Sequence, residues 1–345
     1  MARAYTTEAE ASAVGAEPPV RPGPSGGRRP PRRWCETGAW RRGWVLAVLA
    51  AALAGVMVVH SRVPNAVGNL GSLLETFLPW CGLGVPLLLL AALLRRSLTG
   101  LVALLLPALV WASLFGGLLT DKTAQASEGD LTVLSHNVDA ANPDPAGTAA
   151  ALADAEADVL ALAELPARAL DVYEEALAQE YPHHTVQGTV GVWSRYPLTD
   201  SEPVDIKIGW NRALRTTVRT PQGEVAVYAA HLPSVRVKVN AGFTAGQRDD
   251  AAEQLGQAIA REPLGRVVLL GDLNGTMNDR ALAPVTAQMR STQGAAGAGF
   301  GFTWPASFPL TRIDQIMVKG IEPVSSWTLP ATGSDHLPVA ASVTL

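Results

Sequence analysis

The chain has 345 residues, which allows about two domains, and its charge is divided between two unlike parts. Residues 1–120 carry 11 Lys and Arg against 5 Asp and Glu, a net charge of +6, whereas residues 121–345 carry 16 against 26, a net charge of −10. The acidic part repels polyanions at long range, which argues against general nucleic-acid binding, and it contains no disulfide because Cys35 and Cys81 both precede it.

The N-terminal segment, residues 1–43, is rich in Pro, Gly, Ala and Arg and has no apolar period. Such a segment cannot bury enough apolar surface to fold, so we predict a disordered basic tail. The alternative to a plain solvated tail is a contact with anionic lipid close to a bilayer.

Three uncharged apolar stretches follow within residues 44–120, at 44–59, 77–94 and 101–119. Their lengths lie near the lower limit for a membrane-spanning helix, which is about 17–20 residues. The first stretch could also be the core of a signal peptide, but the long preceding tail and the two further stretches favour a retained anchor. We therefore predict an anchor of three transmembrane helices.

Basic residues beside these stretches predict their orientation. Arg41 and Arg42 precede the first stretch, and Arg95 and Arg96 form the turn between the second and third. The loop between the first and second stretches, residues 61–76, has only Arg62. The positive-inside rule places the tail and this turn in the cytoplasm. Residues 121–345 are then the extracellular domain of a multi-pass protein of the cell membrane with a cytoplasmic N-terminus.

Residues 121–345 alternate between strand-like and helix-like patterns, which predicts a layered α/β domain. We expect strands at 131–135, 158–163, 189–194, 214–220, 224–231, 267–270, 313–318 and 339–343, and helices at 146–157, 168–180 and 247–261. His183 and His184 are expected in a loop. Residues 302–305 are expected to form a loop near the functional site, with Trp304 favoured as a core residue.

Polar residues recur where predicted strands end. Each one alone has an ordinary explanation, since Asn is common in turns and a lone His is more often a satisfied core or surface group. Their recurrence in one domain instead indicates metal-assisted phosphoester hydrolysis, in which a carboxylate holds a hard cation and an oriented imidazole faces the phosphorus. The set comprises Asn137, Glu164, His231, Asp272, Asn274, Asp314, Asp335 and His336.

The order and context of this set resemble the endonuclease/exonuclease/phosphatase superfamily, which includes DNase I, base-excision endonucleases, inositol-polyphosphate phosphatases and neutral sphingomyelinases. The resemblance implies a four-layer α/β/β/α sandwich of the DNase I-like kind, here preceded by three transmembrane helices, with the site at one edge of two packed sheets. Gln315 and Ala163 depart from the usual pattern and leave the substrate open. The matching strings are LSHNV (134–138), VLALAE (159–164), GVWSRYPL (191–198), VYAAHLP (227–233), GDLN (271–274), RID (312–314) and SDH (334–336).

The resemblance also implies a metal site. Glu164 would bind Mg²⁺, with Mn²⁺ as the alternative ion, Asn137 would lie close by as a ligand or phosphate contact, and Asp335 would complete the metal shell or the charge network. Carboxylate and amide oxygens without cysteine suit a hard dication.

The remaining residues would act on the water and the phosphate. By the same resemblance, Asp272 and Asn274 would position and deprotonate the attacking water and hold the phosphate. Asp314 would orient His336, and His336 with His231 would stabilise charge on the phosphate oxygens in the transition state.

Three arginines are candidate phosphate contacts, because a guanidinium can pair with anionic oxygens through two hydrogen bonds. These are Arg212, Arg215 and Arg248. Ordinary salt bridges are an equally good explanation for each of them.

An outward-facing phosphohydrolase on a three-helix anchor resembles the teicoplanin-resistance membrane proteins of actinobacteria, the VanJ type. This resemblance implies hydrolysis of undecaprenyl pyrophosphate at the outer leaflet and a role in glycopeptide resistance. The expected partners are a lipid-linked phosphate and the membrane, with no nucleic acid expected and no protein partner evident. The alternatives are a phospholipase C-like phosphodiesterase, an extracytoplasmic nuclease, or a non-catalytic protein that shields a lipid from glycopeptide.

Overall fold

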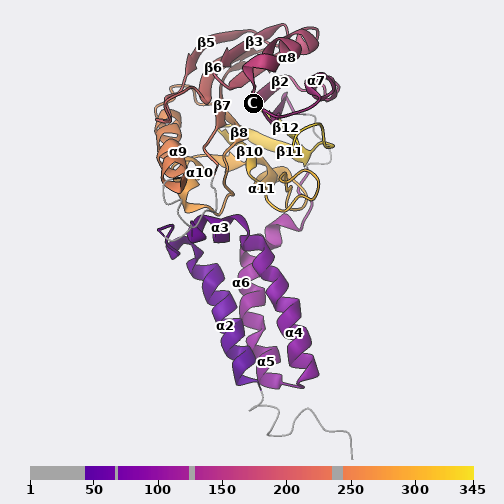
Figure 1. Cartoon of the computed structure of the whole chain (residues 1–345), viewed down its shortest axis with the longest axis vertical. Helices are drawn as coiled ribbons and strands as arrows, with labels where there is room; N and C mark the ends of the chain where they lie inside the picture. Colours follow the sequence, from indigo (N-terminus) through magenta and orange to yellow (C-terminus); the bar gives the residue numbers. More distant parts are fainter. Residues whose placement is uncertain (1–42, 67–68, 124–128, 235–243) are drawn as a thin grey trace, which may run out of the picture.

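The computed structural model describes residues 43–66, 69–123, 129–234 and 244–345, and it places a sandwich of strands and helices above a group of apolar helices (Figure 1). The basic tail predicted for residues 1–43 lies outside the described residues except for Gly43.

The apolar helices run side by side below the sandwich (Figure 1). Two continuous helical segments, Trp44–Arg62 with mean hydropathy 2.1 and Leu98–Leu118 with mean hydropathy 2.2, are long and apolar enough to cross a membrane. A third span exists if Leu70–Thr76 and Leu78–Leu94, which are bent by 71° relative to each other, act as one. The α-helices of this part are α2 (Trp44–Val59), α3 (Leu70–Thr76), α4 (Gly84–Leu94), α5 (Leu98–Ala103) and α6 (Leu105–Phe115).

The short helix α3 was not expected in the loop between the first two apolar stretches. It lies between the apolar helices and the sandwich (Figure 1). Ser72 accepts a hydrogen bond from Arg248, and the Glu75 carbonyl accepts one from Thr276. A helix of seven residues is unstable alone, so these contacts with the sandwich stabilise it.

The sandwich contains two mixed sheets, each with six strands among the described residues. In the first sheet the order is β11-β12-β1-β2-β4-β3, and in the second it is β5-β6-β7-β8-β10-β9. The first sheet comprises β1 (Leu131–Asn137), β2 (Val159–Ala163), β3 (His183–Gln187), β4 (Val190–Ser194), β11 (Glu322–Thr328) and β12 (Val339–Thr344). The second comprises β5 (Leu198–Pro203), β6 (Ala213–Thr220), β7 (Gly223–His231), β8 (Val267–Asp272), β9 (Arg290–Ser291) and β10 (Asp314–Lys319).

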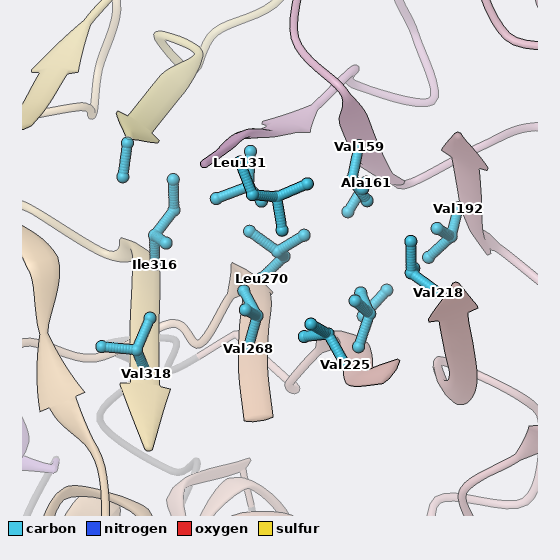
Figure 2. Packing of buried hydrophobic residues seen from close by; sticks show 14 of the residues in the cluster. Leu131, Val159, Ala161, Val192, Val218, Val225, Val268, Leu270, Ile316 and Val318 are labelled. Carbon is cyan, nitrogen blue, oxygen red and sulfur yellow. The ribbon is translucent and has the colours of Figure 1, made fainter. Parts of the chain in front are cut away.

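Apolar side chains of the two sheets face each other and form the central core (Figure 2). Leu131 and Val159 of the first sheet pack towards Val268 and Leu270 of the second. These strands are apolar on both faces because helices cover their outer sides as well.

Helices on both outer faces complete the layers. On the first sheet, α7 (Pro145–Ala153) and α8 (Leu170–Leu177) bury Leu152 and Tyr173. On the second, α9 (Thr244–Ala260) and α10 (Ala283–Thr286) bury Leu255 and Val285. A last short helix, α11 (Thr292–Ala296), packs against β11 of the first sheet. The predicted four-layer α/β/β/α sandwich is therefore confirmed.

The prediction of a loop at His183 and His184 is wrong. Both begin the edge strand β3, where His184 stacks on the ring of Trp193 at 5.8 Å between ring centres. An edge strand has one side without a neighbouring strand and tolerates polar residues, so its sequence pattern resembles a loop.

Candidate active site

The strand register brings the predicted polar residues to one edge of the two sheets. In the second sheet, His231 on β7 lies opposite Asp272 on β8, and Asp272 lies opposite Asp314 on β10. In the first sheet, Asn137 ends β1 beside the end of β2, which Glu164 follows. The amide Nδ2 of Asn137 donates to Oδ2 of Asp272 at 3.1 Å, so a hydrogen bond joins the two sheets at the site.

His336 forms a buried acid–imidazole pair with Asp314. The ring Nδ1 lies 2.8 Å from Asp314 Oδ2, while Nε2 is 3.9 Å from Asp272 Oδ2 and 3.8 Å from Asp335 Oδ1. Burial alone would lower the pKa of His336, but the Asp314 carboxylate and its hydrogen bond, followed by Asp272 and Asp335, outweigh it and raise this pKa to about 10. At neutral pH the imidazolium donates from Nδ1 to Asp314 and directs its Nε2 proton at the site.

Asp272 is buried between the two sheets. Its Oδ1 accepts from the backbone N–H of Asn274 at 2.8 Å, and its Oδ2 accepts from Asn274 Nδ2 at 3.1 Å. Burial first, and then the negative charge of Asp314, raise the pKa of Asp272 to about 7. Asn274 holds this arrangement from a left-handed backbone conformation with φ of 47°.

Glu164 and its neighbours provide the oxygen ligands of a candidate metal site. Glu164 has a left-handed backbone with φ of 59° and lines a pocket of about 430 Å³ together with Asp139, Asp272 and Asp335. Mg²⁺ prefers oxygen ligands of this kind.

The charge balance at this edge also fits a dication. Asp272 and Asp314 repel each other, and Asp314 Oδ1 is buried with no hydrogen-bond partner in the described part of the chain. A dication held at Glu164 would offset this excess of negative charge.

His231 is predicted to stabilise charge, and the structure places it between Glu164 and Asp272. Its Nε2 is 3.3 Å from Glu164 Oε1 and 3.7 Å from Asp272 Oδ2. Burial, followed by the adjacent Arg212 guanidinium and by His336, lowers the pKa of His231 well below its ordinary value. His231 is therefore neutral and acts through hydrogen bonds, whereas Arg212, whose Nη2 contacts the imidazole, supplies the positive charge beside Glu164.

Arg215 and Arg248, the other two arginines predicted to contact the phosphate, do not line this pocket. Arg215 points from β6 to the helix-covered face, where its Nε and Nη2 bind Glu262 at 3.1 and 2.9 Å. Arg248 is fully buried and donates to Asp279 Oδ2 at 2.6 Å and to the Asn274 carbonyl at 2.9 Å. Both guanidinium groups are occupied by protein oxygens and lie outside the pocket lining.

Residues missed from the sequence also shape the site. Ser334 donates to the Asn137 carbonyl at 2.7 Å and accepts from the His336 N–H at 3.0 Å, which fixes the loop that carries His336. Trp304, expected in the core, instead lines the pocket and donates from Nε1 to Asp335 Oδ2 at 3.1 Å. The position of Ser334 directly before Asp335 is the feature of the sequence that points to it. The prediction that the loop around Trp304 lies beside the site agrees with the structure.

One wall of the pocket comes from the apolar helical part. Ser72, Leu73, Thr76 and Phe77 line it opposite the catalytic candidates. Nothing in the sequence of α3 distinguishes these residues from an ordinary connecting loop.

The fold resembles solved structures over almost their full lengths. Beta toxin from Staphylococcus aureus matches with a TM-score of 0.51 and 17% identity, over 61% of this chain and 99% of that one. TDP2 from D. rerio in complex with a single-strand DNA product matches with a TM-score of 0.53 and 20% identity, over 62% and 99%. A functionally unknown conserved protein from Enterococcus faecalis matches with a TM-score of 0.53 and 13% identity, over 62% and 99%.

Among curated proteins nothing matches this chain. The model of the endonuclease/exonuclease/phosphatase family matches residues 134–336, which is more than half of the chain and spans the site from β1 to His336. With the two packed sheets and the strand-end polar residues described above, this match shows that the chain belongs to the endonuclease/exonuclease/phosphatase family.

Proposed function

We propose that this protein is a divalent-metal-dependent phosphohydrolase that acts on a lipid-linked phosphate at the outer face of the cell membrane. The observation that carries this proposal is the composition of the pocket: carboxylates and His336 form one side, and α3 with Phe77, at the top of the apolar helices, forms another. A phosphate bound there lies beside the segment that would enter the bilayer.

The residues at the site support hydrolysis. A bound Mg²⁺ or Mn²⁺, held by Glu164 with Asp335, would neutralise phosphate charge and lower the pKa of a bound water. Asp272, whose pKa is about 7, is suited to accept the proton of the attacking water at neutral pH. As the water oxygen bonds to phosphorus and the bond to the leaving oxygen breaks, the Nε2 proton of His336 stabilises the charge on a phosphate oxygen.

A lipid pyrophosphate is the substrate class that we favour. Its anhydride has two groups of phosphate oxygens, which a dication and the positively charged His336 can contact. Its hydrocarbon chain is compatible with a site above apolar helices. Undecaprenyl pyrophosphate fits this description, and its hydrolysis would connect the protein to teicoplanin resistance. In this proposal residues 44–120 form a three-helix anchor, the N-terminus is cytoplasmic and residues 121–345 are extracellular.

Two alternatives remain. A phospholipase C-like phosphodiesterase would use the same pocket and anchor but would release head groups from phospholipids. A nuclease is the other, since D. rerio TDP2 was solved with a single-strand DNA product. The net charge of −10 on residues 121–345 disfavours a polyanionic substrate.

The test uses the purified full-length protein in detergent with a polyprenyl pyrophosphate. Phosphate should be released with Mg²⁺ or Mn²⁺ and should cease with a chelator. His336→Ala and Asp272→Asn should each lower kcat by about 10²–10⁴-fold, whereas Glu224→Gln, on an exposed strand pair far from the site residues, should have no effect. Head-group release from phospholipids or plasmid nicking, without phosphate release from the pyrophosphate, would overturn the proposal in favour of an alternative.

A further inference from the structure

A second pocket, lined by apolar and aromatic residues, lies where the sandwich meets the apolar helices. Its volume is about 450 Å³, and we call it the aromatic pocket. Trp80 and Trp111 come from the helical part, and Phe300 and Phe302 come from a loop of the sandwich. Such a pocket suits a hydrocarbon ligand, since burial of apolar surface is its main source of affinity.

The walls of this pocket are fixed in place. Trp80 Nε1 donates to the Leu310 carbonyl at 2.8 Å, and Trp111 Nε1 donates to the Pro79 carbonyl at 2.8 Å. With both indole N–H groups already bonded, only the carbon faces of the rings are offered to a ligand. Gly82 permits the close approach of Trp111, because a Cβ at this position would overlap the indole.

The aromatic side chains from the two parts of the molecule interlock. Phe302 stacks on Trp80 with ring centres 5.8 Å apart, and Phe300 stacks on Phe302 at 5.1 Å. Phe300 also contacts Trp111 at 6.3 Å. The aromatic pocket is therefore a joint structure of the sandwich and the apolar helices.

The aromatic pocket lies beside the pocket that Glu164, Asp272 and His336 line, which we call the catalytic pocket. Phe77 lines the catalytic pocket, and Pro79 and Trp80 line the aromatic one. The backbone N–H of Trp80 donates to the Phe77 carbonyl at 3.0 Å. Leu310, whose carbonyl accepts from the Trp80 indole, directly precedes Thr311 of the catalytic pocket. The two pockets therefore lie next to each other at the junction of the sandwich and the apolar helices.

We infer that the aromatic pocket binds the hydrocarbon chain, next to the phosphate, of the polyprenyl lipid that is hydrolysed in the catalytic pocket. This inference rests on the proposed function and extends it, because it gives the helices a part in substrate selection. Each isoprene unit is apolar and has a planar double bond, so it can lie against the flat faces of the aromatic rings in this pocket.

A pocket-filling variant tests the inference. Ala108 on α6 lines the aromatic pocket, whereas Ala112, one turn later, is exposed on the same helix. Ala108→Trp should lower kcat/KM for a long-chain polyprenyl pyrophosphate by about tenfold or more. It should leave kcat/KM for methyl pyrophosphate, which has no isoprene unit to place in the aromatic pocket, unchanged, and Ala112→Trp should alter neither value. Equal effects of Ala108→Trp on the two substrates, or no effect on either, would overturn the inference while phosphate release still supports the proposed function.

A binding measurement separates the two proposals completely. A polyprenyl monophosphate with a photoreactive group in its first isoprene units, added to the full-length protein, should crosslink to peptides that contain Trp80, Trp111 or Phe302, and Ala108→Trp should suppress this. Such crosslinking without any pyrophosphate hydrolysis would reject the proposed reaction alone. Crosslinking spread over the outer surfaces of the helices, or an equal yield from a photoreactive phospholipid, would reject the chain-binding pocket.

Discussion

At the scale of single residues, the charge of His336 depends on Asp314. The imidazole is buried, and without a neighbouring carboxylate burial would keep it neutral at physiological pH. Asp314, followed by Asp272 and Asp335, raises the pKa of His336 to about 10, so the ring remains charged from acidic pH up to that value. The proposed stabilisation of phosphate charge therefore depends on a residue that does not line the catalytic pocket.

Asp314→Asn should remove this support. The pKa of His336 should fall, because burial is then opposed only by the more distant Asp272 and Asp335. At pH 7.5 the imidazole would be neutral, and kcat should fall by about 10²–10³-fold. The rate of the variant should recover in part as the pH is lowered, since the ring regains its proton.

Histidine NMR titration of the full-length protein, read together with the pH–rate profile, checks this expectation. Asp171→Asn, an exposed carboxylate on α8, is the control and should change neither measurement. An unchanged titration of His336 in Asp314→Asn would show that Asp314 does not set its charge.

The sequence could predict which residues meet at the site but not their charges. Asn137, His231 and Asp272 each follow or end an apolar strand, and the ends of neighbouring strands lie at one edge of a sheet. That His231 is neutral follows first from its burial, and that His336 is charged follows from Asp314 on β10. Arg215 also depends on a distant partner, Glu262, which is 47 residues away in the chain.

At the scale of elements, a buried ion pair fastens α9 to the second sheet. Glu262, just beyond α9, accepts two hydrogen bonds from Arg215 on β6 and one from Tyr228 Oη on β7 at 2.7 Å. Burial would raise the pKa of Glu262, but the hydrogen bonds from Arg215 and Tyr228, with the Leu264 N–H, outweigh it and lower this pKa.

Glu262→Gln should destabilise the sandwich in a pH-dependent way. Because the pKa of Glu262 is lower in the folded than in the unfolded state, its stabilisation is complete above the unfolded value of about 4.3 and is lost as the pH falls through the folded value. At pH 7 the variant should lose about 2–4 kcal/mol of unfolding free energy, since Arg215 is left buried without its partner. Below about pH 4 the difference from the wild type should shrink.

Guanidinium unfolding followed by tryptophan fluorescence at several pH values measures this difference. Glu224→Gln is the matched control, because Glu224 pairs with Arg219 on the exposed surface and should contribute less than about 1 kcal/mol. A constant difference between pH 7 and pH 4 would contradict the assigned pKa shift.

A second buried ion pair connects three elements. Arg248 on α9 bonds to Asp279, to the Asn274 carbonyl two residues after Asp272, and to Ser72 on α3 at 3.1 Å. It therefore links the position of α3 to the loop that follows Asp272.

Arg248→Met should lower the free energy of unfolding by about 3–5 kcal/mol, because it leaves the fully buried Asp279 carboxylate unpaired. The double variant Arg248→Met/Asp279→Leu removes both charges and should recover part of this loss. Chemical unfolding of the single and double variants measures both effects. No recovery in the double variant would mean that the contacts to Asn274 and Ser72 dominate.

At the scale of the whole molecule, the layers of the sandwich follow from the sequence but the junction with the helices does not. Alternating strands and helices with apolar strands predict two sheets covered by helices. The docking of α3 and the interlocked rings of Phe300 and Trp111 depend on contacts between residues about 175 to 200 positions apart in the chain. The sequence of residues 61–76 therefore looks like a plain loop, although Ser72, Leu73 and Thr76 line the pocket.

The proposed topology predicts which parts of the chain are accessible from outside the cell. With Cys35→Ser and Cys81→Ala as the background, single cysteines can be placed at Glu175, exposed on α8, and at Arg95, exposed in the turn between α4 and α5. A membrane-impermeant maleimide should label Glu175→Cys in intact cells, because the sandwich is outside. It should label Arg95→Cys only after permeabilisation, because the basic turn is held in the cytoplasm, where Arg96 still favours this orientation. The reverse pattern would place the catalytic pocket in the cytoplasm, away from any substrate in the outer leaflet, and labelling of both sites in intact cells would mean that α4 and the helices after it do not span the membrane.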